Sequence, residues 1–242
     1  MMLQVTTESV GTFDGMQPVG EEVTMPAPVR PIAYAEPRIV RHDAPDGSSI
    51  LRSTVPLAPY EPSLARLFRA AVERNPEGLF LAERTADAAW RELTYEDARE
   101  TVDALAQGLI ERGLSAERPV MILSGNSVDH ALLTLAGHTA GIPVAPISVA
   151  YSLQSQDHAK LKHIAELLKP GLIYVADTAP FAKSLAALDL RGVEIVAGRN
   201  GANLADVTLF DDLAETRPGP TLDRAMAAIR PDTIAKFLFT SG

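Results

Sequence analysis

The chain has 242 residues, a length that suits one large domain or two small ones. Its 46% hydrophobic and 22% charged residues are typical of a globular protein and exclude a fibrous chain. The net charge of −9 argues against nucleic acid and anionic membranes as partners. The chain has no cysteine, which excludes disulfides, thiolate zinc sites and a catalytic thiol and fits a cytoplasmic protein.

The first part of the sequence differs from the rest. Residues 1–29 contain no Lys or Arg and no continuous apolar run, so we expect a flexible N-terminal tail rather than a secretory signal. Residues 32–59 are rich in proline and are expected to be irregular, with a turn at residues 45–47. The most apolar stretch, residues 130–150, changes midway from a helical to an extended pattern, which favours a buried helix–strand unit over a membrane span.

Local signals then predict the first helices and strands. Ser63 is expected to cap a helix that stops before Pro76. Residues 79–82 and 89–93 are predicted to form a small antiparallel pair. Thr94, with Asp97 three residues later, predicts a capping box and a long helix that ends at Gly113.

From residue 120 onwards, apolar strands alternate with amphipathic helices. The strands are expected at 120–123, 142–146, 172–175 and 193–196, followed by a final strand at 235–239. The helices are expected at about 127–140, 157–168, 181–188 and 222–229. This alternation predicts an α/β fold with a mostly parallel sheet covered on both faces.

Few residues suggest chemistry by themselves. The complete patterns GxGxxG and GxxxxGK[ST] are both absent. The turn at residues 124–127 follows a strand and opens a helix, so its amides could hold an anion, but a simple capped turn is the favoured interpretation. His130 and His138 lie about 12 Å apart along one helix, too far to bind one metal ion, and His158 and His163 point to different faces. No catalytic residue and no metal ligand is predicted.

Three segments, taken in order, resemble the adenylate-forming acyl-CoA synthetase superfamily. They are residues 93–97, residues 119–127 with their continuation at 140–147, and residues 232–242. Three shorter segments are similar to feruloyl-CoA synthetases, namely residues 30–37, 114–119 and 150–153. The resemblance implies that residues 30–242 form part of an AMP-binding (adenylation) domain: the incomplete N-terminal portion of the large domain, with a mostly parallel sheet flanked by helices.

The resemblance also implies an activity. Family members use ATP and Mg²⁺ to convert a carboxylate into an acyl adenylate with release of pyrophosphate, and coenzyme A then displaces AMP to give a thioester. The substrate implied here is a small aryl carboxylic acid, ferulate. Thr240, Ser241 and Gly242 match the start of the family's phosphate-binding loop, so the resemblance assigns ATP phosphate contacts to these three residues.

The later segments of the family, including the loop lysine and the C-terminal catalytic lysine, have no counterpart in these 242 residues. We therefore expect the sequence to be part of a longer ligase, and this chain alone to form no adenylate. Two alternatives remain open: a non-catalytic truncated protein that acts as a binding or assembly partner, and a ligase for a different aryl or fatty acid. An unpaired edge at residues 235–239 predicts poor solubility or self-association.

Overall fold

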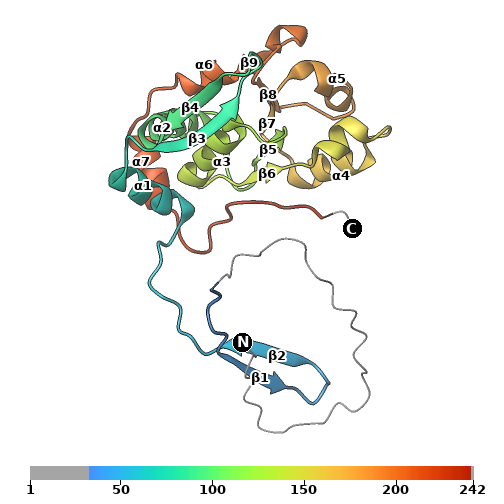
Figure 1. The fold of residues 1–242 in the computed structure, drawn as a ribbon. Coiled ribbons are helices and arrows are strands. Elements are labelled where there is room, and N and C mark those ends of the chain that lie inside the picture. Colours follow the sequence, from blue (N-terminus) through green and yellow to red (C-terminus); the bar gives the residue numbers. More distant parts are fainter. Residues whose placement is uncertain (1–32, 241–242) are drawn as a thin grey trace, which may run out of the picture. The chain divides into compact units, whose positions relative to one another are not determined.

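The structure is a computed structural model and describes residues 33–240 (Figure 1). The predicted tail at residues 1–29, together with Ser241 and Gly242, therefore lies outside the described residues. The described chain falls into two compact units that divide after Tyr60.

The first unit contains an antiparallel hairpin of β1 (Ile39–Asp43) and β2 (Ser49–Ser53). The predicted turn is confirmed, with Gly47 at a φ of +83° that favours glycine. The prediction of irregular structure on both sides of the turn is wrong. Every residue of the two strands is exposed, so neither strand shows the alternation of buried and exposed residues that signals a strand in a sequence.

The second unit begins with elements that the sequence predicted well. Helix α1 (Leu64–Arg74) is capped by Ser63, whose hydroxyl accepts from the amide of Arg66. Strands β3 (Leu79–Arg84) and β4 (Trp90–Thr94) pair antiparallel. Helix α2 (Tyr95–Glu111) opens with the predicted Thr94–Asp97 capping box.

A five-stranded parallel sheet forms the centre of this unit, in the order β6-β5-β7-β8-β9. Its strands are β5 (Val120–Leu123), β6 (Val144–Pro146), β7 (Leu172–Val175), β8 (Glu194–Ala197) and β9 (Val207–Leu209). The α/β class and the parallel sheet flanked by helices are thereby confirmed.

Helices cover both faces of the sheet (Figure 1). They are α3 (Val128–Ala140), α4 (Ala159–Leu168), α5 (Thr178–Ala186), α6 (Phe210–Ala214) and α7 (Pro220–Ala227), with a π-helical turn (Ala150–Gln154) and a 3-10 turn (Gly201–Asn203). Val120 and Ile122 of β5 join the core with α1, α2, α3, α6 and α7, whereas Met121 and Leu123 join the core with α4 and α5. Burial on both faces explains why β5 is apolar at every position.

The C-terminal segment departs from the prediction. Residues 235–239 were expected to form a strand, but they form only an isolated parallel bridge, between Val144 and Lys236. A regular strand needs continuous pairing along at least one side, and here the pairing stops after one bridge. Helix α5 also begins three residues earlier than predicted because Asp177 caps it, and β9 and α6 were not predicted.

Candidate functional site

The carboxyl end of the parallel sheet is the first place to look for a site, because ligands of open α/β sheets bind there. At this edge the chain leaves β5 through residues 124–127 and enters α3. The hydroxyl of Ser127 accepts from the amide of His130 at 3.1 Å and caps the helix. A second donor, the amide of Val128, bonds to the Glu83 carboxylate at 2.9 Å.

Glu83 belongs to a small network of charged side chains. The guanidinium of Arg91 bonds to Glu83 at 3.1 Å and to Asp129 at 2.7 Å. A carboxylate at a helix N-terminus also interacts favourably with the helix dipole. The start of α3 therefore already holds an anion, which comes from the protein itself, and the structure supports the interpretation of residues 124–127 as a capped turn.

Tyr174 of β7 also belongs to this network. Its hydroxyl donates to Asp129 over 3.4 Å. Burial, followed by the charge of Asp129, raises the pKa of Tyr174, so the phenol stays protonated. This tyrosine is thus a buried donor in the network rather than a base.

A serine and a histidine also meet at this edge. The Nδ1 atom of His130 lies 2.9 Å from the hydroxyl of Ser124 and 3.2 Å from the carbonyl oxygen of Gly125. Burial is the main cause that lowers the pKa of His130. The neighbouring Asp129 is directed to Arg91 and Tyr174 instead, so these side chains do not form a catalytic triad.

The segment that leads to Thr240, the first of the predicted phosphate-binding residues, lies along the same edge. The amide of Val144 donates to the carbonyl of Ala235 at 3.1 Å, and the amide of Phe237 donates to the carbonyl of Val144 at 3.0 Å. This parallel register carries the segment past Pro146, the last residue of β6, and brings Thr240 beyond the carboxyl end of the sheet. Of the three predicted residues, only Thr240 falls within the described part of the chain.

Alternate residues of this segment point to opposite sides. Phe237 and Phe239 pack against the core of α4 and α5, whereas Leu238 is 73% exposed. The carbonyl of Thr240 accepts a long hydrogen bond of 3.5 Å from the hydroxyl of Tyr151. The backbone of this segment is thus held by hydrogen bonds to Val144 and Tyr151, while the side chain of Thr240 is exposed.

A cavity of about 550 Å³ lies beside Thr240. Tyr151, Ile164 and Phe239 supply apolar surface, and Lys160 and His163 of α4 supply basic groups. The ammonium of Lys160 lies 5.4 Å from the centre of the Tyr151 ring. Together with the hydroxyl of Thr240, this lining suits an anionic ligand that carries an apolar or aromatic part.

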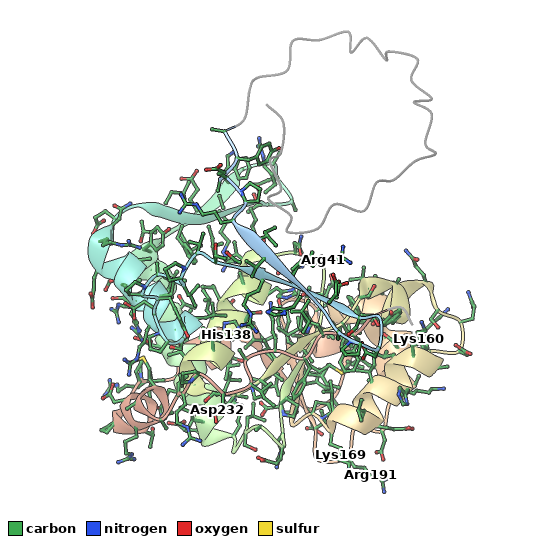
Figure 2. All side chains as sticks on the ribbon, turned by 90° about the horizontal axis from the view of Figure 1, so that it is seen from below. Arg41, His138, Lys160, Lys169, Arg191 and Asp232 are labelled. Carbon is green, nitrogen blue, oxygen red and sulfur yellow. The ribbon has the colours of Figure 1, made fainter. Side chains whose placement is uncertain are left out.

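The opposite end of the sheet also carries charge. Figure 2 shows Lys169 and Arg191 close together at one side of the unit, and both line a cavity of about 780 Å³. Glu117, Glu166 and Asp189 line the same cavity, so positive and negative groups are mixed there. It lies at the amino ends of the strands and offers no concentrated positive surface for a nucleotide.

Potential metal ligands do not gather into a cluster in the described part of the chain. Within residues 33–240, no three His, Cys, Asp or Glu side chains form a group that could hold a metal ion. Over the same residues, no helix has the length and apolar character needed to span a membrane.

The sequence reasoning missed the contact between Glu83 and the start of α3. One signal was available, since Glu83 and Arg91 are directly opposite each other in the β3–β4 hairpin, where opposite charges attract. The link from this pair to Val128 and Asp129 joins residues far apart in the chain and has no local signature.

Comparison with known proteins places this chain in a family. The family model described as "AMP-binding enzyme" matches residues 68–242, which is more than half of the chain. A peptide synthetase of Streptomyces viridochromogenes, phosphinothricin tripeptide synthetase PhsC, is 29% identical over 159 residues, covering 64% of this chain and 12% of its own length. The long-chain-fatty-acid–CoA ligase FadD15 of Mycobacterium bovis is 28% identical over 176 residues, covering 70% of this chain and 28% of its own length.

A solved structure shows the same fold. McyG A-PCP complexed with phenylalanyl-adenylate superposes with a TM-score of 0.55 at 20% identity, over 77% of this chain and 31% of that chain. This chain therefore spans less than a third of the length of each of these three proteins.

Proposed function

The chain belongs to the AMP-binding enzyme family, and from this premise we propose that residues 30–242 form the first part of the adenylation domain of an ATP-dependent acid–CoA ligase. The observation that carries the proposal is the family match, which runs from residue 68 through the C-terminal segment. The position of Thr240 beyond the carboxyl end of the sheet supports it, because parallel α/β sheets bind their ligands at that edge.

The proposed reaction has two steps. A carboxylate oxygen attacks the α-phosphorus of ATP, which gives an acyl adenylate and pyrophosphate. The thiol of coenzyme A then attacks the acyl carbon, and AMP leaves. In the first step negative charge grows on the phosphates, so Thr240, Ser241 and Gly242 are proposed to contribute donors to those oxygens.

We propose ferulate, or a closely related aryl acid, as the substrate. The similarity of residues 30–37, 114–119 and 150–153 to feruloyl-CoA synthetases supports this choice. A fatty acid is the second candidate, favoured by the similarity to FadD15, which is named a long-chain-fatty-acid–CoA ligase. The aromatic and apolar lining of the cavity beside Thr240 suits both acids.

The substrate test compares two polypeptides. One is the 242-residue chain, which we expect to release no pyrophosphate with ferulate. The other is the chain extended in frame by the codons that follow Gly242, which we expect to show ferulate-dependent pyrophosphate release and to form feruloyl-CoA. A panel of ferulate, benzoate and a long-chain fatty acid then ranks the acids by kcat/KM.

The residue test uses the extended polypeptide. Replacing both hydroxyls, as Thr240→Ala with Ser241→Ala, is expected to lower kcat by about tenfold to a thousandfold because charge-stabilising donors are lost. Thr85→Ala in the β3–β4 hairpin is the matched control and is expected to leave kcat unchanged. Equal activities of the two variants would refute the assigned phosphate contacts.

The rival proposal is a non-catalytic binding or assembly partner. It predicts a stop codon directly after Gly242, whereas the ligase proposal predicts a continuation that encodes Ser-Thr-Gly-x-Pro-Lys. Ferulate-dependent pyrophosphate release by the purified 242-residue chain would contradict the expectation that this chain is inactive by itself.

A further inference from the structure

A smaller cavity lies beside the residues that lead into the C-terminal segment. Its volume is about 170 Å³, and it is enclosed by the start of α1, the end of α3 and residues 229–235. His138 of α3 lines it, and Figure 2 shows this residue well away from Lys160 and the cavity beside Thr240. The two cavities therefore share no lining residue.

His138 is one of several buried polar residues without a hydrogen-bond partner among the described residues, together with Thr134, Thr139 and Ser152, but the only one of these four that lines this cavity. The side chain belongs to a residue that is only 8% exposed, and neither ring nitrogen has a hydrogen-bond partner within the described chain. Buried polar groups in folded proteins are almost always bonded to protein, ordered water or a ligand. Since the described chain supplies no partner and the cavity adjoins the ring, a molecule in the cavity, either water or a ligand, can supply one.

The charge state of His138 defines what such a guest must offer. Burial, assisted by the ammonium of Lys236, lowers its pKa to about 4. At neutral pH the ring is therefore uncharged and presents one donor and one acceptor. The polar residues around it are Ser63, whose hydroxyl caps α1, and Arg230, which is bonded to Asp232.

Six further lining residues are apolar and help to define the guest. The apolar residues are Pro62, Leu64, Ile229, Pro231, Ile234 and Ala235. An apolar cavity of about 150 Å³ is large enough to take up benzene. The space beside His138 is comparable, so one aromatic ring fits, and the nearby Lys236 and Arg230 disfavour a cation.

We propose that this cavity is a binding site for a neutral, single-ring hydroxyaromatic molecule of the size of phenol, whose hydroxyl bonds to His138. The ring packs against the apolar lining, and the hydroxyl donates to the unprotonated nitrogen of the imidazole. The guest contacts Thr233, Ile234 and Ala235, so its binding braces the segment that leads to Thr240. The site is independent of ATP and of the proposed ligase activity.

The test measures phenol and toluene binding to the 242-residue chain by calorimetry at pH 7, with toluene as the probe that has the same shape but no hydroxyl. We expect saturable binding of phenol by the wild-type chain. His138→Leu is expected to weaken phenol binding by about tenfold, the effect of one lost buried hydrogen bond, and to change toluene binding less than twofold. His42→Leu in the exposed strand β1 lines neither cavity, so it is the matched control and should leave both affinities unchanged.

A second measurement does not depend on any variant. In a chain labelled with ¹⁵N at histidine, phenol should shift the ring resonances of His138 and leave those of His42 in place. Phenol affinity should also be constant from pH 8 to pH 6, because His138 stays neutral throughout that range. Two results would overturn the proposal. One is the absence of saturable phenol binding, which would mean that water alone fills the cavity, and the other is tighter binding of benzoate than of phenol at His138.

Discussion

Two neighbouring elements at the carboxyl end of the sheet use their polar groups in opposite ways. In the turn between β5 and α3, Ser124 and Ser127 both bond to His130, and the amide of Val128 bonds to Glu83 of the β3–β4 hairpin. The C-terminal segment, residues 234–240, is bonded along one side only and leaves Leu238 and the side chain of Thr240 exposed.

This difference separates a structural turn from a candidate ligand site. The strand–turn–helix around residues 124–127 has a geometry that often binds phosphate. Here, however, the Glu83 carboxylate already accepts the hydrogen bond of an amide at the start of α3. The C-terminal segment has a weaker local signature, yet its groups remain accessible. Whether a helix N-terminus can bind a ligand depends on what already satisfies its donors, and only the tertiary structure shows that.

The largest expected effect compares one leucine from each element. Leu123, at the end of β5, is fully buried, and Leu123→Ala should lower the free energy of unfolding by about 3 kcal/mol. Leu238→Ala should change it by less than about 0.5 kcal/mol because that side chain is 73% exposed. Urea unfolding at low protein concentration measures both values. A large loss for Leu238→Ala would mean that self-association buries this side chain.

A second prediction concerns His138, which lies where α3 meets the C-terminal segment. Its pKa is lowered from 6.5 in the unfolded chain to about 4 in the folded one. The folded state therefore binds fewer protons, so the contribution to stability is complete above pH 6.5 and is lost as the pH falls towards 4. The loss is expected to reach about 3 kcal/mol.

Urea unfolding at a series of pH values measures this dependence. His138→Leu should flatten the slope between pH 6.5 and 4, whereas His163→Leu should retain it. Some slope should remain in His138→Leu because the pKa of His130 is lowered as well. An unchanged slope in His138→Leu would show that the imidazole is solvated in the folded state.

The third prediction removes the carboxylate at the start of α3. Glu83→Ala leaves the Val128 amide and part of Arg91 without a partner, and should lower the free energy of unfolding by about 2 kcal/mol. Added sulfate should restore part of that loss by binding at the vacated helix N-terminus. Glu92→Ala, on the exposed side of β4, is the control. It should neither lower the free energy of unfolding in the same way nor be stabilised specifically by sulfate. If sulfate stabilised both variants equally, the effect would not be specific to this site.

Local signals in the sequence were sufficient for much of the fold. Ser63 and Thr94 were recognised as helix caps, and the cap of α3 was narrowed to Asn126 or Ser127, because a cap acts within three residues of its own position. The strands at 120–123 and 172–175 were recognised because burial on both faces leaves a short, wholly apolar run. In each case the physical cause lies within the segment itself.

The features that could not be predicted depend on distant parts of the chain. The bond from Glu83 to Val128 joins residues 45 positions apart, so no local pattern reports it. Residues 235–239 have the composition of a strand, but forming one depends on the partners available along their edges. For the candidate site, the sequence could suggest Thr240 only through a family resemblance, whereas the exposed position of this residue at the sheet edge came from the structure.

The smallest expected effect reduces the comparison to one hydroxyl in each element. Ser127→Ala removes the cap of α3 and should lower the free energy of unfolding by about 1 kcal/mol. Thr240→Ala removes an exposed hydroxyl and should leave stability unchanged within about 0.5 kcal/mol. Ser63→Ala, which removes the cap of α1, calibrates the cost of losing a cap in the same protein. Equal losses for Ser127→Ala and Thr240→Ala would mean that the Thr240 hydroxyl already has a structural partner, and the distinction between an occupied turn and an accessible segment would then fail.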